Sequence, residues 1–180
     1  MAQSTLNTPM LWINTYVKEK LDEKLINVFP GGIPFFPTSP STIDNITQAV
    51  AEDQNAYAVY DRMFRMRTSP FPHVKTEQVI YYFYTGGENP SVNMIQVQEL
   101  IMRLMDREDE TAEEINAWAK ARGAIEVDGQ SIEPNYYFHT FKVFHLEEAR
   151  DIVDFGTART FAGNKFIIQY EYHYVDTETL

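Results

Sequence analysis

The stretch TSPFPHVKTEQVIYYFY, residues 68–84, decides how the fold is interpreted. Its prolines predict a corner, and the β-branched and aromatic residues that follow are typical of a strand. Successive side chains of a strand point to opposite faces. Large rings on both faces of one strand predict that both faces are covered. The two sets are Tyr82 and Tyr84 on one face, and Tyr81 and Phe83 on the other.

Hydrophobic periodicity extends the prediction to the rest of the chain. Apolar residues recurring every three or four positions predict helices, and alternation predicts strands. Ser91 and Thr111 are expected to cap two helices at their N-termini, and Gly123 is expected at a C-cap. Residues 147–162 fit no single pattern, although an extended segment is favoured. The expected helices are residues 8–28, 41–51, 92–105 and 111–123; the strands are 56–66, 74–84, 136–146 and 165–175; the turns are 127–130 and 162–164.

Helices and strands are grouped along the chain and do not alternate strictly. This order predicts an α+β fold with a mostly antiparallel β-sheet and helices packed on one face. The length of 180 residues fits a single domain. We expect it to comprise an N-terminal helix (8–28), an extended arm (29–40), an α+β core (41–175) and a tail (176–180).

The arm, FPGGIPFFPTSP, is rich in proline and phenylalanine. Proline is incompatible with a central strand, and exposed phenylalanine is costly, so we expect the arm to lie on its own domain or on a neighbour. Because exposed aromatic side chains are costly, we also expect subunits to contact each other through aromatic residues of the strands. The candidate interface residues are Phe35, Phe36, Phe71, Tyr81, Phe83, Tyr136 and Phe138.

Composition argues against several classes of function. The net charge is −11, with 26 acidic and 15 basic residues, and no basic stripe of the kind that duplex DNA readers carry is visible. The chain has no cysteine, which removes disulfides and thiolate chemistry. No apolar run approaches the about 18 residues that cross a bilayer, so no membrane partner is expected.

No catalytic, cofactor-binding or metal-binding pattern stands out, so we expect no enzyme activity and no cofactor. His139 and His145 share a strand face but lie ~20 Å apart, too far for one metal. His139 and His173 are able to meet across paired strands. A structural or surface role is favoured for the histidines.

Charged clusters have two interpretations each. Arg62, Arg65, Arg67 and Lys75 either contact phosphates or, as we favour, pair with the acidic excess. The acidic runs either line a channel for DNA, where like charge prevents sticking, or coat the outer surface for solubility. The candidate channel residues are Glu108, Asp109, Glu110, Glu147, Glu148 and Asp151.

Two segments carry a resemblance to a known family. YDRMFRMRTSPFPHVKTEQVIYYFY, residues 60–84, and LMDREDETAEEINAW, residues 104–118, resemble neck and tail-completion proteins of contractile-tailed bacteriophages, particularly marine phages of cyanobacteria. The order of elements is also similar to that of tail terminators. The likeness rests on the order of elements and on short stretches of sequence, and it covers about two thirds of the chain.

The resemblance implies an α+β subunit in a ring, usually a hexamer, that ends the tail tube and joins the connector. The implied partners are copies of the chain and the tube, sheath and connector proteins, with DNA passing through without specific binding. The implied location is the virion neck, after assembly in the host cytoplasm. Two alternatives stay open: a head-completion or stopper protein, and a cytosolic small-molecule-binding protein or enzyme using the tyrosine and histidine cluster.

Overall fold

The computed structural model describes residues 9–37, 55–63, 73–154 and 160–175, and side chains are described except at 62–63 and 144–154. It shows an α+β fold, as predicted. The predicted helix at 41–51 lies outside the described residues. The elements are α1 (Pro9–Lys24), β1 (Phe35–Pro37), β2 (Ala56–Met63), β3 (Lys75–Thr85), α3 (Pro90–Met105), α4 (Asp109–Arg122), β4 (Ile125–Val127), β5 (Gln130–Ile132), β6 (Tyr136–Asp154) and β7 (Thr160–Tyr174).

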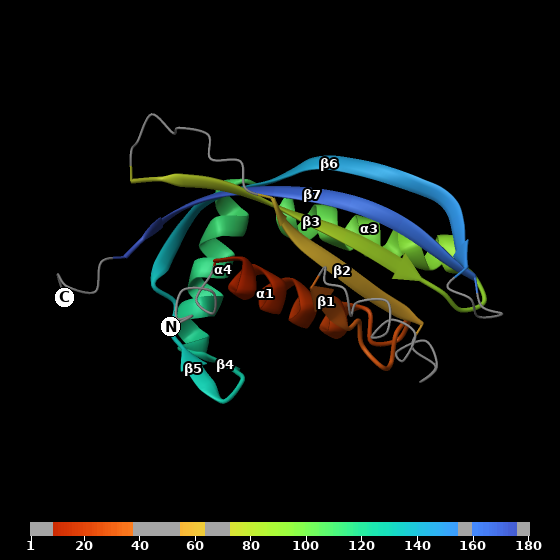
Figure 1. Cartoon of the computed structure of the whole chain (residues 1–180), viewed down its shortest axis with the longest axis horizontal. Coiled ribbons are helices and arrows are strands. Elements are labelled where there is room, and N and C mark those ends of the chain that lie inside the picture. The colour runs from red at the N-terminus through yellow and green to blue at the C-terminus, as the bar shows by residue number, and fades with distance from the viewer. Residues whose placement is uncertain (1–8, 38–54, 64–72, 155–159, 176–180) are drawn as a thin grey trace.

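A five-stranded sheet in the order β1-β2-β3-β7-β6 forms one layer of the molecule (Figure 1). β1 runs parallel to β2, and the other neighbours are antiparallel, so the sheet is mostly antiparallel. β4 and β5 form a separate hairpin. Its two central residues, Asp128 (φ 50°) and Gly129 (φ 76°), both have positive φ, which matches the twist of a two-residue hairpin turn.

All three described helices pack on one face of the sheet, which we call the helix face. Strand alternation places the largest apolar side chains there, and they are buried because the helices exclude water from them. The opposite, outer face is covered by no helix in the described part of the chain. The helix-face rings include Tyr81, Phe83, Phe138, Phe141, Phe166, Tyr170 and Tyr172.

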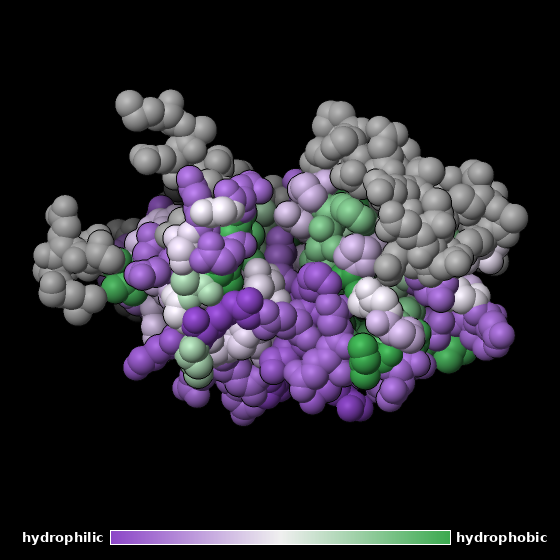
Figure 2. Space-filling view, turned by 90° about the horizontal axis from the view of Figure 1, so that it is seen from below, coloured by the Kyte–Doolittle hydropathy of each residue, from purple (hydrophilic) through white to green (hydrophobic). Residues whose placement is uncertain are grey.

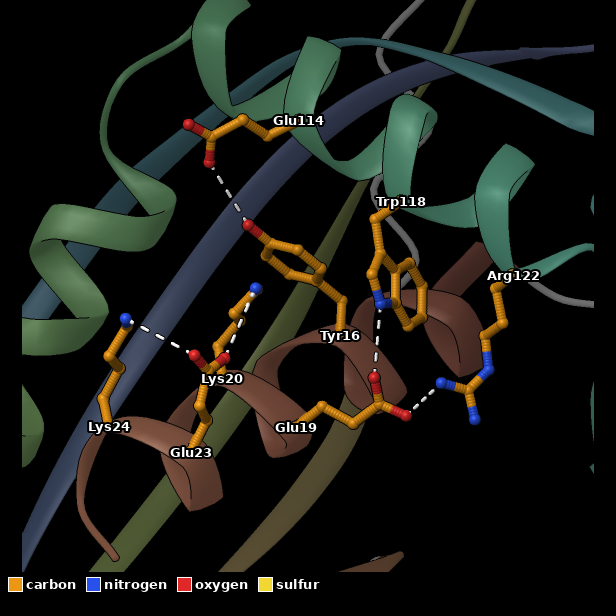
Figure 3. A network of polar contacts seen from close by, with 8 residues as sticks. All are labelled: Tyr16, Glu19, Lys20, Glu23, Lys24, Glu114, Trp118 and Arg122. Atoms are coloured by element: carbon orange, nitrogen blue, oxygen red, sulfur yellow. Dashed lines mark hydrogen bonds and ion pairs between the residues drawn. The ribbon is translucent and has the colours of Figure 1, made fainter.

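Polar contacts, in addition to apolar packing, hold the helices together. The Tyr16 hydroxyl donates to Glu114 at 3.3 Å, and Trp118 Nε1 donates to Glu19 at 3.2 Å (Figure 3). Arg122 also pairs with Glu19. These bonds join α1 to α4, although about 100 residues separate them in sequence. Side chains of α4 therefore hold α1 in place over the sheet.

Two of the three expected helix caps are wrong. α3 begins with Pro90 after Asn89, not with Ser91 as its cap, because proline is suited to the first helical turn. α4 begins at Asp109, and Thr111 lies inside it, donating to the Leu104 carbonyl at 2.9 Å. Acidic Asp109 and Glu110 favour the earlier start, since a helix N-terminus attracts negative charge. The expected C-cap at Gly123 is confirmed.

The turn expected at residues 162–164 is also wrong, because these residues lie inside β7. Gly163 pairs with Tyr84 and Asn164 with Phe83, so strand pairing overrides the local turn signal. Asn164 is buried, and its side chain donates to Gln98 of α3 at 3.3 Å. The extended state favoured for residues 147–162 is confirmed over Glu147 to Asp154, which belong to β6.

Candidate assembly surfaces

Four of the seven candidate interface rings are wrong as surface residues. Tyr81, Phe83, Tyr136 and Phe138 are 0%, 1%, 6% and 1% exposed, respectively, and belong to the main core of this chain. Helices α1, α3 and α4 already supply the cover that the alternating rings demanded, so these side chains offer nothing to a neighbour. Phe71 lies outside the described residues.

The two arm phenylalanines divide between the faces. The expected arm is partly a strand, because β1 adds to the sheet edge beside β2. Phe35 packs edge-on against Tyr81 and Phe83, with ring centroids 5.9 Å and 5.7 Å away. Phe36 joins a small second cluster on the outer face. Both rings are half-buried and lie on their own domain, which is one of the two places expected for the arm.

The outer face has an aromatic half and a polar half. The aromatic half surrounds buried Tyr57 and Phe161, whose ring centroids are 5.4 Å apart. In the polar half, Gln78 Nε2 donates to Gln169 Oε1 at 3.0 Å. Glu171 accepts bonds from Thr76 and Thr140 at 3.4 Å and 3.2 Å. The side chains of β7 on this face are half-exposed from Lys165 to His173.

Large exposed apolar residues gather at one end of the sheet, where β6 begins and β7 ends. Tyr137, Tyr174 and Val175 are 45%, 41% and 38% exposed, respectively. With His139 and His173 they form what we call the β6–β7 corner. The sequence prediction named Tyr136 and Phe138, which share the buried face of β6, and missed Tyr137 between them. Alternation along β6 was the signal that places Tyr137 on the opposite face.

The predicted meeting of His139 and His173 is confirmed. His139 Nε2 lies 2.7 Å from His173 Nδ1, and the ring planes are tilted by 35°. Tyr137 stands 5.5 Å and 5.7 Å from the two imidazole centroids. Burial lowers the pKa of His173, and the charges of His139 and His73 lower it further. No group suited to hold a metal ion occurs among the described His, Asp and Glu residues.

Both edges of the sheet carry protecting features, on β6 between Phe138 and Val143 and on the short β1. On β6, the Asn116 side chain exchanges two hydrogen bonds with the Phe138 backbone, at 2.8 Å and 3.0 Å. The Val143 N–H donates to Asp106 at 3.0 Å. On the other side, β1 is three residues long and ends in Pro37. Capped, short and proline-containing edges resist added strands, so side-chain surfaces are the better contacts.

The candidate channel residues Glu108, Asp109 and Glu110 are exposed at the junction of α3 and α4. Arg107 partly neutralises them, lying 3.5 Å from Glu110 and 2.6 Å from Glu114. The hydrogen bond from Arg107 is the largest cause of the lowered pKa of Glu114. The other three candidates lie on β6, and their side chains are outside the described set: Glu147, Glu148 and Asp151.

The residues of the basic cluster are also described only in part. Arg62 belongs to β2, and Arg65 and Arg67 fall outside the described residues. Lys75 lies over the Tyr174 ring at 4.7 Å from its centroid. The described lower face in Figure 2 is mainly hydrophilic, with separate hydrophobic residues between the polar ones.

A hollow of about 330 Å³ separates α1 from the edge strands. Several polar groups of its lining bind within the chain: Lys18 binds Asp22 at 2.5 Å and the Ile33 carbonyl at 3.1 Å. Asn14 Oδ1 accepts a hydrogen bond from Tyr81, whereas its Nδ2 is buried without a hydrogen-bond partner. The first bonds hold the segment before β1 to α1, and the last holds β3 to α1.

Comparison with known proteins adds no identification: no protein-family model matches the chain, and no curated protein matches it. Among the described residues, no helix has the length and apolar character needed to cross a membrane.

Proposed function

We propose that this chain is a structural subunit of the head–tail junction of a contractile-tailed bacteriophage. It forms a ring that caps the tail tube and joins it to the connector. A head-completion or stopper ring is the alternative within the same class. The proposal continues the resemblance of residues 60–84 and 104–118 to that family.

The observation that carries the proposal is the one-sided cover of the sheet. Three helices cover most of the helix face, while the outer face ends in the β6–β7 corner with its exposed Tyr137. Tyr174 is exposed at the same corner but on the helix side of β7. Tyrosine is enriched in protein interfaces because it combines an apolar ring with a polar tip. Capped sheet edges direct contacts to such side-chain surfaces. The corner therefore replaces the buried rings as the proposed contact between subunits.

The exposed carboxylates fit a conduit for DNA. A cyclic ring repeats Glu108, Asp109 and Glu110 once in every subunit, which multiplies their field in a narrow channel. Such a field repels phosphate and lets DNA pass without sticking. We expect the free protein to bind duplex DNA weakly even at low salt, as measured by fluorescence anisotropy. Tight, salt-sensitive binding would instead favour a nucleic-acid-binding role.

Assembly is tested by native mass spectrometry and electron microscopy of the protein alone and with tail tubes. Tyr137→Glu should abolish ring formation, because it places a charge in the proposed contact. Val92→Glu is the matched control, since Val92 is 54% exposed on α3, away from the corner. A protein that stays monomeric even with tail tubes contradicts the proposal, and loss of rings only in the control moves the contact to the helix layer.

The imidazole pair favours one candidate of another class, a small-molecule-binding protein or enzyme in the cytosol. His139, His173 and Tyr137 do come together, as that hypothesis requires. A thermal-shift screen of metabolites separates the two classes. A compact monomer stabilised by one ligand class, and no longer so in His139→Gln, would favour the binding protein.

A further inference from the structure

Three of the four histidines lie together at the β6–β7 corner. His139 and His173 share a hydrogen bond of 2.7 Å between ring nitrogens. The His73 ring lies 6.4 Å from that of His173, nearly perpendicular to it. The three rings come from the segment before β3, from β6 and from β7, so only the folded sheet brings them together.

A β-bulge lies at the pair. Phe138 pairs with Tyr172 and Thr140 with Glu171, which leaves His139 as the extra residue of β6. A bulge re-aims side chains that strict alternation would send elsewhere. Alternation from Tyr137 already directs His139 to the outer face and to His173, and the bulge turns Thr140 to the same face, where it reaches Glu171.

The chemistry of the bond limits how many protons the pair accepts. A hydrogen bond between two ring nitrogens needs one N–H and one lone pair. A neutral pair satisfies this, and a singly protonated pair does so with a stronger, charge-assisted bond. When both rings are protonated, each facing nitrogen carries a hydrogen, and two positive charges oppose each other. The second proton therefore removes the bond and adds repulsion.

The surroundings relieve that repulsion only in part. His73 adds a further imidazole, whereas Lys75 pairs with Tyr172 and lies on the opposite, helix face. Glu171 shares the face with His173, but its two oxygens are turned to the hydroxyls of Thr76 and Thr140, so its negative charge offsets the repulsion in part. The remaining neighbour, Tyr137, has a neutral hydroxyl. Acidification thus accumulates positive charge at the corner.

We propose that His139 and His173 form a proton-operated latch between β6 and β7, closed while the pair holds at most one extra proton and opened by the second. Opening frees the start of β6 and with it the exposed Tyr137 ring, which contacts both imidazoles. The latch belongs to the fold of the single subunit and does not depend on ring assembly. If the corner also joins subunits, acid would weaken that contact.

The test is amide hydrogen exchange of the full chain from pH 7.5 to 5.0, corrected for intrinsic rates, with NMR titration of the imidazoles. The two rings should titrate in separate steps. Corner amides at residues 137–140 and 171–173 should lose protection about ten-fold, since the net contribution of one hydrogen bond, about 1.4 kcal/mol, corresponds to that factor. Core amides of β3 should keep theirs over the same range.

His139→Gln and His173→Gln should each abolish this loss of protection, because neither leaves a pair to be doubly protonated. Both variants are measured so that a folding defect in one of them does not decide the result. His73→Gln is the control: it should shift the midpoint but keep the opening. The latch is wrong if both rings titrate together without change in protection, or if both glutamine variants open with acid as the wild type does.

Discussion

The two faces of the central sheet differ in what completes them, although the same strands build both. On the helix face, Tyr170 and Tyr172 are completely buried, and their hydroxyls donate to the carboxylate of Glu77 at 2.8 Å and 2.7 Å. On the outer face, Gln78 and Gln169 meet each other, and β7 stays half-exposed. The helices close one face within the chain, whereas on the other face no described helix covers the strands.

The difference teaches that ring count alone does not mark an interface. The helix face carries most of the large buried aromatic side chains, and these rings are buried within their own chain. The exposed rings that remain available for contact are few, and they lie at the β6–β7 corner. A face rich in rings buries them first, because transfer of apolar area from water is the main gain in folding.

The sharpest test of this comparison removes one ring from each face. Phe138→Ala should lower the free energy of unfolding by about 3–5 kcal/mol, because a buried phenylalanine leaves a cavity. Tyr82→Ala, on the half-exposed outer face, should cost about 1 kcal/mol. Urea denaturation measures both. Equal losses would mean that the outer face is as closed as the helix face.

A second test uses neighbouring polar residues that point to opposite faces. Glu77 and Gln78 are both buried, at 4% and 6% exposure. Glu77→Ala should cost about 2–4 kcal/mol, because two buried tyrosine hydroxyls lose their acceptor. Gln78→Ala removes one side-chain bond and should cost about 1 kcal/mol. Thermal and urea unfolding compare the pair, and a larger loss for Gln78→Ala would reverse the order of the faces.

A third test concerns the helix layer that closes the helix face. Burial, and then the charge of Glu114, raises the pKa of Tyr16 from 10.0 to about 12. The unfolded chain therefore loses this proton first, so the stability that Tyr16 contributes is complete below pH 10 and is lost as pH rises through 12. Relative to Tyr16→Phe, the wild type should lose about 2 kcal/mol across that window.

Urea unfolding from pH 8 to 12 measures the difference between the two proteins. At pH 8 the wild type should be slightly more stable, because it keeps the bond to Glu114. Other buried tyrosines affect both proteins alike and cancel in the comparison. A constant difference across the whole range would show that Tyr16 ionises equally well in the folded and unfolded states.

The smallest expected contrast lies on β1, where adjacent rings face opposite ways. Phe35→Ser should cost about 2 kcal/mol, because this ring packs on Tyr81 and Phe83 of the helix face. Phe36→Ser, on the outer cluster, should cost about 1 kcal/mol. Circular dichroism with chemical denaturation checks the order. Unchanged stability in both variants would return the two rings to a role outside their own domain.

Much of the secondary structure was predictable, because alternation and helical spacing are local properties. The strand at residues 165–175 and the C-cap at Gly123 needed no partner to be recognised. The turn expected at Gly163 failed because pairing with Tyr84 outweighs a local turn preference. The bulge at His139 left no signal, since it depends on the register of two distant strands.

The sequence by itself determined which side chains share a face, because the period of a strand is fixed by backbone geometry. It separated Tyr81 and Phe83 from Tyr82 and Tyr84 correctly. Only the tertiary structure decided which of these sets the helices would cover. That choice depends on contacts such as Tyr81 with Asn14 and Tyr16 with Glu114, which join segments 67 and 98 residues apart. Burial is a property of the assembled layers, and no local pattern encodes it.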